Sequence, residues 1–309
     1  MTAVAVALAV QSARIDPERI LADHFQFTSK ELGQAAQGQA VVRVKVDGDE
    51  LAAVGAIRLP GRKERLADWI KNIEHFRRSA ELGIAQPVAV PPTAGAFAGL
   101  TLDAKDREAL SACTSAKCAM RMTTGAIAEL QRSGMAAADD VFRRMLLGEL
   151  TNYIKNGNAA AVGGLARKAA TLTSVAPELA AFVERYPAAT LPAPPTSEQL
   201  FYWASTPTGT VSIISLHHLI VYRPHLGEIW IADKNIFASR YFDTAVLIVG
   251  LYDAADGNGF YAVAGSRAIS GYLGGTAGSL LRRQIQRSAA DEVKMYLEWI
   301  RDSLSAAAR

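Results

Sequence analysis

Two adjacent histidines, His217 and His218, are the residues of this chain best suited to do chemistry, because they lie in a run that reads as a β-strand, SLHHLIVYRP. Successive side chains of a strand point to opposite faces, so one imidazole must face inward. An inward imidazole can be a satisfied core residue, a ligand anchor or a general base. We expect His218 on the inner face with Tyr222, and His217 on the outer face or under the helical middle third.

An inward His218 requires a hydrogen-bond partner, because leaving a buried polar group unpaired costs about 1–3 kcal/mol. Tyr222, Tyr241 and Asp243 are candidates on neighbouring segments. The run SRYFDT is expected to place Tyr241 and Asp243 on one face of a long strand, where a solvated outer face would explain them equally well. The predicted ligand-binding residues are His218, Tyr222, Tyr241, Asp243 and Arg267.

Arg267 lies near the end of the last predicted strand, where a C-terminal helix would meet the sheet. An ion pair with Asp243 or Glu228 is the structural alternative for its side chain. No Gly-x-Ser-x-Gly, His-Glu-x-x-His or phosphate-loop pattern is present, so we expect no cofactor and no catalytic residue of these types.

The only two cysteines, Cys113 and Cys118, are separated by four residues. Two thiols without a neighbouring histidine cannot complete a tetrahedral zinc shell, and the spacing matches neither a redox Cys-x-x-Cys nor a haem attachment site. We expect no metal site. If the chain is exported the pair should form a local disulfide, whereas free thiols are expected in the cytosol.

The first residues indicate export. Residues 1–13, MTAVAVALAVQSA, contain an apolar run followed by small residues, as in a secretory signal, although the basic start of such a signal is missing. An apolar beginning of the first helix is the alternative. No later segment has the roughly 18 uncharged apolar residues of a membrane span, so we expect a periplasmic or secreted protein without a transmembrane segment.

Composition describes an ordinary globular protein. The 309 residues are 50% hydrophobic and 20% charged, with 33 basic and 30 acidic side chains. Because no long run of like charge occurs, we expect no nucleic-acid partner.

Several elements that would position the histidines can be predicted from local pattern. Alternating valines, an Asp-Gly turn and a returning apolar strand predict a hairpin over 40–59, followed by an amphipathic helix over 63–76. From residue 211 onward four antiparallel strands are expected, joined by RPHLG, KN and AADGNG, and then one long helix from about 280 to 304.

The middle third has a different character. It begins and ends in Pro- and Ala-rich loops, and helical patterns fill it, including a helix over 137–156 that Gly157 should end. We therefore predict one domain over 14–309, with 87–200 as a mostly helical insertion. The fold class is α+β, an antiparallel curved sheet wrapped on a long C-terminal helix.

Two segments resemble START-type lipid-transfer domains of the helix-grip (SRPBCC) family. The first is GQAVVRVKVDGDELAAVGAIRLPGRKERLADWIKNIEHF, and the second runs from GFYAVAGSRAISGYLGG into SLLRRQIQRSAADEVKMYLEWI. Together they cover about half of the chain, and the whole pattern is also similar to exported bacterial proteins with a two-cysteine element. The helical middle third departs from a minimal START domain.

The resemblance implies a cavity between sheet and helix that binds a hydrophobic small molecule or lipid without chemistry. Two other functions stay open from the sequence. One is a helix-grip enzyme of the cyclase or hydrolase type with His218 as general base. The other is a structural or interaction protein that has no ligand cavity.

Overall fold

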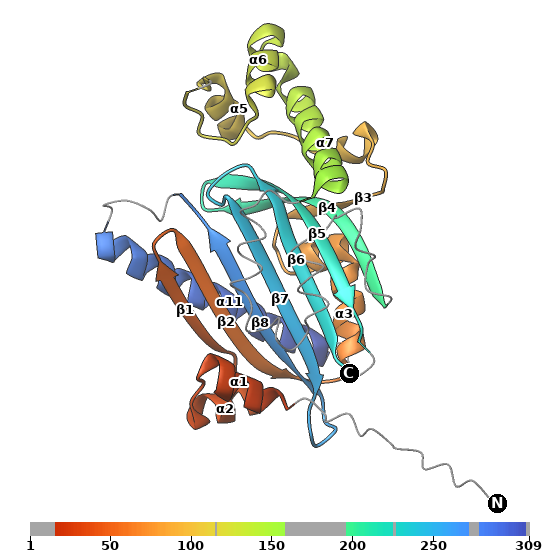
Figure 1. The fold of residues 1–309 in the computed structure, drawn as a ribbon, viewed down its shortest axis with the longest axis vertical. Helices are drawn as coiled ribbons and strands as arrows, with labels where there is room; N and C mark the ends of the chain where they lie inside the picture. Colours follow the sequence, from red (N-terminus) through yellow and green to blue (C-terminus); the bar gives the residue numbers. More distant parts are fainter. Residues whose placement is uncertain (1–15, 115, 158–195, 225–226, 272–277, 307–309) are drawn as a thin grey trace, which may run out of the picture.

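One antiparallel sheet of eight strands organises the molecule, in the order β1-β2-β8-β7-β6-β5-β4-β3. The computed structural model describes residues 16–114, 116–157, 196–224, 227–271 and 278–306 (Figure 1). The strands are β1 (Val41–Asp47), β2 (Glu50–Leu59), β3 (Ile84–Val88), β4 (Ser197–Thr208), β5 (Val211–Tyr222), β6 (Ile229–Ala238), β7 (Thr244–Asp253) and β8 (Phe260–Ile269).

The predicted N-terminal hairpin is confirmed. β1 and β2 pair antiparallel with Asp47 opposite Glu50, which leaves Gly48 and Asp49 as the two-residue loop. Gly48 has a φ of 61°, the left-handed conformation that this type of tight turn requires and glycine adopts without strain.

The strands after residue 211 are confirmed in number, but one connection was predicted wrongly. The pair Lys234-Asn235, expected as a loop, lies inside β6, and the chain turns instead at residues 239–243. Tyr241 has a φ of 64° in this turn and is exposed, so the run SRYFDT is not part of a long strand. The turn contains neither glycine nor proline, which is why local sequence did not reveal it.

Strands β3 and β4 were not predicted. β4 pairs with β5 along its whole length, with Phe201 opposite His218 and Tyr202 opposite His217. The last part of β4, ASTPT, is rich in residues typical of loops. Pro207 can be accommodated there because β3 is short and pairs with β4 only at residues 201–205, so that the strand has a free edge at Pro207.

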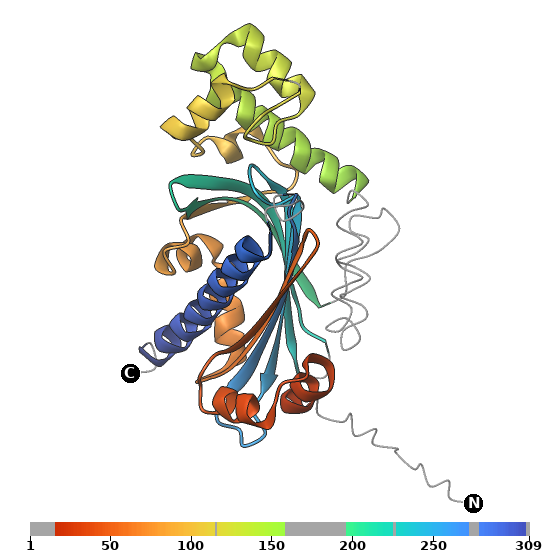
Figure 2. The ribbon, with the colours of Figure 1, turned by 90° about the vertical axis from the view of Figure 1, so that its left-hand side faces the viewer.

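The C-terminal helix α11 (Gly278–Ala306) crosses one face of the sheet over β1 and β2 (Figure 2). Gly55 on β2 permits this close approach, since a Cβ at that position would lie 2.9 Å from Leu297 Cδ1 and 3.2 Å from Val293 Cγ1. The helix buries the apolar side chains of Leu297, Ile300 and Leu304 against the sheet.

A pair of short helices lies beside α11 on the same face. The helix predicted over 63–76 is divided at Asn72 into α3 (Lys63–Lys71) and α4 (Ile73–Ser79). Trp69 and Phe76 from this pair meet Trp299 of α11, with ring centroids 5.2 Å and 6.0 Å apart, so the two helical elements form one aromatic contact.

The chain between β3 and β4 is helical where it is described. Helices α5 (Ala104–Ser111), α6 (Thr124–Ser133) and α7 (Ala138–Asn156), with two short 3-10 turns, pack against the ends of β4, β5 and β6. Gly157 follows α7 with a φ of 83°, as its predicted capping role requires. Three sequence patterns fall wholly or mostly outside the described residues. They are the apolar run of residues 1–13, the helical pattern APELAAFVERYP and the glycine-rich run GYLGGTAGS, which predicts a bend.

Helices α1 (Pro17–Phe25) and α2 (Ser29–Ala36) cover part of the face opposite α11. Their apolar residues Leu21, Phe27 and Ala35 join one core cluster with Trp230 and Val263 of the sheet. Both faces of the central strands are therefore buried.

Candidate functional site

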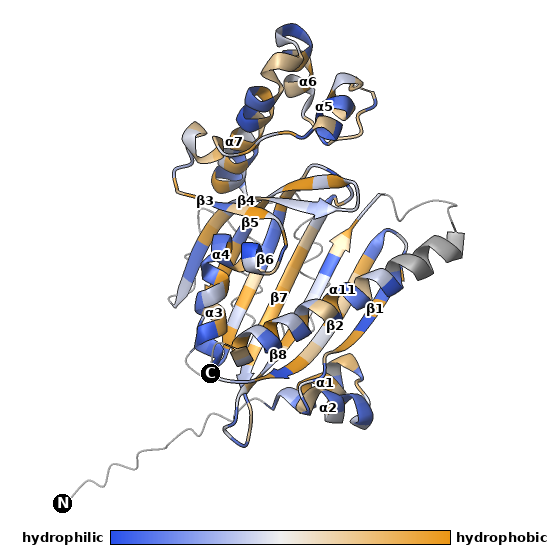
Figure 3. Cartoon of the chain, turned by 180° about the vertical axis from the view of Figure 1, so that it is seen from behind, coloured by the Kyte–Doolittle hydropathy of each residue, from blue (hydrophilic) through white to orange (hydrophobic). Residues whose placement is uncertain are grey.

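A cavity of about 800 Å³ lies between α11, the α3–α4 pair and the face of the sheet that these helices cover. Figure 3, in which α11 crosses in front of the sheet, shows how hydrophobic the central strands behind it are. Most of the lining side chains are apolar, and they include Ile70, Phe76, Leu219, Ile231, Leu247, Val249, Ala262, Ala264, Val293, Leu297 and Ile300.

Polar groups gather at one part of this cavity. Tyr202 of β4 and Asp233 of β6 line it, and the Tyr202 hydroxyl donates to Asp233 Oδ2 at 2.6 Å. His217 of β5 places Nδ1 3.0 Å from Asp233 Oδ1 and Nε2 2.8 Å from Ser215 Oγ. The His217 ring also stacks on Tyr202, with centroids 4.6 Å apart and planes 6° from parallel.

Arg77 of α4 adds a positive charge beside this polar group. Its Nη2 donates to the Leu82 carbonyl at 2.8 Å and to Thr206 Oγ1 at 2.6 Å, which holds the guanidinium against the cavity wall. Arg77 Nε is buried and has no hydrogen-bond partner among the described residues. A buried N–H without a partner is a donor available to an acceptor oxygen of a ligand.

The protonation states of the cluster follow from its surroundings. Burial raises the pKa of the Asp233 carboxyl, but the adjacent His217, the hydrogen bonds from His217 and Tyr202, and the charge of Arg77 together bring it below its ordinary value. Burial, then the charge of Asp233, raises the pKa of Tyr202 well above its ordinary value. Asp233 is therefore ionised and Tyr202 is a neutral donor at neutral pH.

The assignment of the two histidines to faces was wrong. Leu219 lines the cavity, and the alternation along β5 turns His217 to the same face and His218 to the opposite one. His218 is fully buried there, with Nδ1 2.9 Å from the Tyr153 hydroxyl of α7 and Nε2 3.1 Å from Gln199 Oε1. Both faces of β5 are apolar, so the sequence carried no signal for which one is concave.

Lys234 lies next to His218 on that second face. Its side chain is fully buried, with Nζ 5.2 Å from the centroid of the Tyr153 ring. Burial lowers the pKa of the Lys234 ammonium to about 7. Burial and then the Lys234 charge lower the pKa of His218 well below its ordinary value.

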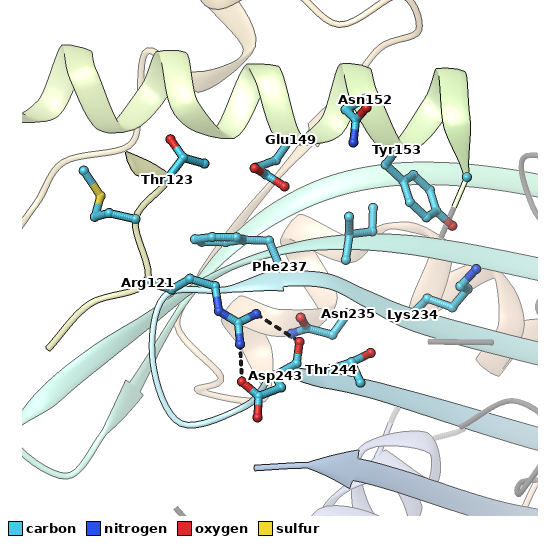
Figure 4. Close-up of a pocket in the computed structure, with 13 residues that line it drawn as sticks. Arg121, Thr123, Glu149, Asn152, Tyr153, Lys234, Asn235, Phe237, Asp243 and Thr244 are labelled. Carbon is cyan, nitrogen blue, oxygen red and sulfur yellow. Dashed lines mark hydrogen bonds and ion pairs between the residues drawn. The ribbon is translucent and has the colours of Figure 1, made fainter. Parts of the chain in front are cut away.

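A smaller pocket of about 260 Å³ reaches Lys234 from the side of α7 (Figure 4). In that view Glu149, Asn152 and Tyr153 project from α7 toward β6, and Arg121 pairs with Asp243 at the far side. Asp243 is the one predicted ligand-binding residue that lines a described pocket, and this pocket is separate from the large cavity.

The other predicted site residues are dispersed. Tyr222 is buried in the core cluster on the face opposite the cavity, and Tyr241 is exposed in the turn after β6. Arg267 also lies opposite the cavity, because its neighbour Ser266 lines it, and Arg267 pairs with Glu50 rather than with Asp243 or Glu228. The structure does not bring His218, Tyr222, Tyr241 and Arg267 together.

The disulfide between Cys113 and Cys118 is present, in the loop between α5 and α6. Cys113 is buried in the cluster formed by α5, α6 and α7. In the described ranges no three His, Cys, Asp or Glu side chains gather as a metal site, and no helix there is long and apolar enough to cross a membrane.

Sequence reasoning missed Arg77, Tyr202, Ser215 and Asp233, and it assigned His217 to the outer face. The available signal was the spacing of Ser215 and His217, which places the two side chains on one face of a strand. Asp233 and Tyr202 reach them only through the register of β4, β5 and β6. Neither a scan of the chain against protein-family models nor a search of curated proteins finds a match.

Proposed function

We propose that this protein binds a hydrophobic small molecule or a lipid in the large cavity, without chemistry on that ligand. The sheet and α11 would then form a helix-grip arrangement of the START type, with α5, α6 and α7 as a helical insertion. The observation that carries the proposal is the cavity itself, about 800 Å³ with a mostly apolar wall and a few polar groups at one part. Ligand sites commonly have this size and composition.

The polar groups indicate how the ligand would be oriented. Arg77 and the Tyr202–Asp233 pair offer both donors and acceptors on a mostly apolar wall. An amphiphile with one polar end and an aliphatic or ring body satisfies both parts. A bound polar group there avoids the cost, about 1–3 kcal/mol, of leaving the Arg77 Nε donor buried without a partner.

The two alternatives are less well supported. An enzyme with His218 as general base would need that imidazole in the cavity, and it lies on the opposite face. A structural protein without a ligand site does not account for the cavity volume. We further propose that the protein acts in the periplasm or outside the cell, and the Cys113–Cys118 disulfide supports an oxidising compartment.

Native mass spectrometry of protein purified from the organism that makes it tests the proposal. We expect a co-purified amphiphile of defined mass. Ala264→Phe should remove it, because Ala264 lines the cavity from β8 and a phenyl ring there fills the space. Ala128→Phe is the matched control, since Ala128 is exposed on α6 away from the cavity. Absence of any bound amphiphile, or equal retention in both variants, would contradict the proposal.

A further inference from the structure

We propose that Ser215, His217 and Asp233 form a nucleophilic triad that cleaves carboxylic esters whose acyl chain occupies the large cavity. This inference goes beyond the proposed function, in which the bound ligand is left unchanged, and rests on it only for the location of the acyl chain. The observation behind it is the continuous hydrogen-bond chain from Ser215 Oγ through the His217 ring to Asp233, with donor–acceptor distances of 2.8 Å and 3.0 Å.

The direction of the hydrogen bonds is determined by Asp233. An ionised carboxylate only accepts, so His217 Nδ1 must carry a proton and donate it to Oδ1. In a neutral imidazole Nε2 is then the acceptor, and Ser215 Oγ must donate to it. This is the tautomer and the order of contacts by which a serine, a histidine and an aspartate activate a hydroxyl nucleophile.

The surroundings hold this arrangement rigidly and keep it dry. Tyr202 stacks on the His217 ring and occupies the second carboxylate oxygen of Asp233. Ser215 is 3% exposed and the His217 side chain 14% exposed, so little water reaches either group. A general base in a water-poor site is worth more than the same base in water, because its electrostatic interactions are less screened.

Arg77, which is hydrogen-bonded to the strand beside Ser215, would stabilise the charge that develops during attack. Ser215 lies opposite Ala204 on β4, and Thr206, whose hydroxyl accepts from Arg77 at 2.6 Å, is two residues further along the same strand and face. Arg77 Nε is the buried donor without a partner among the described residues. A cationic N–H directed at an oxyanion supplies the stabilisation that acyl transfer requires.

The reaction balances without a cofactor. Ser215 Oγ forms a bond to the ester carbonyl carbon as its proton passes to His217 Nε2, and the C–O bond to the alcohol then breaks as that proton passes to the leaving oxygen. Water next gives its proton to His217 Nε2 while its oxygen bonds to the acyl carbon. The bond to Ser215 Oγ breaks, the proton returns to the serine, and a carboxylic acid is released.

Two measurements on the full chain test the triad. The first is hydrolysis of p-nitrophenyl butyrate and p-nitrophenyl dodecanoate, and the second is labelling by a fluorophosphonate followed by peptide mapping. We expect hydrolysis by the wild type and a single label on Ser215. Ser215→Ala should lower kcat/KM by about 10³-fold or more and abolish the label. Ser239→Ala is the matched control, because Ser239 is also a buried serine and, in the part of the chain that the structure describes, its hydroxyl bonds to the Ile214 N–H and to no histidine.

The outcomes separate this proposal from the binding function. A bound amphiphile with no label on Ser215, or equal hydrolysis by the Ser215→Ala variant, would overturn the triad alone. A label on Ser215 without any bound amphiphile would support the triad and overturn the binding function. Ala264→Phe should slow hydrolysis of the dodecanoate much more than that of the butyrate, and equal slowing would overturn the assignment of the acyl chain to the cavity.

Discussion

At the scale of single residues, burial on both faces of the sheet determines the chemistry of the ionisable side chains. The two histidines are adjacent in sequence, yet one pairs with an ionised aspartate and the other lies beside a lysine. Charging His218 would put a second positive charge next to Lys234. The opposite environments of one dipeptide follow from strand alternation alone.

Lys234 should make stability depend on pH. Its folded-state pKa is about 7 against an ordinary value of 10.5, so between these values the unfolded chain binds the extra proton and the free energy of unfolding rises with pH. We expect Lys234→Met to raise stability at pH 7 and to flatten that rise, as measured by urea denaturation. Lys63→Met is the control, since Lys63 is also a buried lysine and its ammonium pairs with Asp253 at 2.5 Å. An unchanged slope in Lys234→Met would contradict the assignment.

His218 should contribute to stability and not to ligand binding. His218→Ala removes a hydrogen bond to the Tyr153 hydroxyl and opens a void in the core, so we expect a loss of about 2–4 kcal/mol in the free energy of unfolding. Retention of amphiphile should stay unchanged, because the side chain lies opposite the cavity. His75→Ala, at an exposed position on α4, is the control and should change neither quantity. Loss of binding in His218→Ala at preserved stability would contradict the face assignment.

At the scale of elements, close backbone contacts decide how the edge of the sheet is closed. Gly83 leads into β3 with a φ of 81°, and a Cβ there would lie 2.0 Å from the Ser205 carbonyl oxygen of β4. Gly134 has a nearly identical φ of 77° with no heavy atom within 4 Å of such a Cβ. The two glycines therefore separate the cost of a left-handed backbone from the cost of a steric clash.

Gly83→Ala should destabilise the protein more than Gly134→Ala does. A left-handed alanine costs about 1–2 kcal/mol, which both variants incur, and only Gly83→Ala must also move β3 away from β4. Thermal and urea unfolding of the two variants measure the difference. Hydrogen exchange of the β3 amides should also become faster in Gly83→Ala. Equal destabilisation of the two variants would mean that β3 does not approach β4 this closely.

At the scale of the whole molecule, the two faces of one sheet are covered by different elements. On one side it carries the cavity under α11, and on the other side α1, α2 and the helices between β3 and β4 pack against its two ends. The disulfide lies among the helices between β3 and β4, and neither cysteine lines the cavity. Loss of the disulfide should therefore leave the part of the molecule that forms the cavity folded.

The disulfide should be complete in protein isolated under native conditions. Alkylation without reduction should label neither Cys113 nor Cys118, and alkylation after reduction should label both. Reduction should cost less than the roughly 3 kcal/mol estimated for a 15-residue loop, because this loop is much shorter. Amphiphile binding should survive reduction. Two labelled thiols in unreduced protein would contradict both the bridge and the proposed oxidising compartment.

The local sequence was sufficient to predict the elements that have a regular pattern of apolar residues within a single segment. The hairpin of β1 and β2, helix α7 and helix α11 follow from alternation, turn residues and helical spacing, which depend on near neighbours. The Cys113–Cys118 bridge is also local, because it joins residues only five positions apart. The break at Asn72 and the turn at Tyr241 have no such signal in the local sequence.

Only the tertiary structure decided which face of β5 faces the cavity. Strands that are buried on both sides alternate between two apolar faces, so the sequence pattern cannot distinguish the cavity wall from the opposite core. Ser215, His217 and Asp233 come together because β5 and β6 pair in one register, with an irregularity between Leu216 and His217 that shifts it. A shift of the β5 register by one residue would place His218 instead of His217 on the cavity face, and no local property of the sequence distinguishes the two registers.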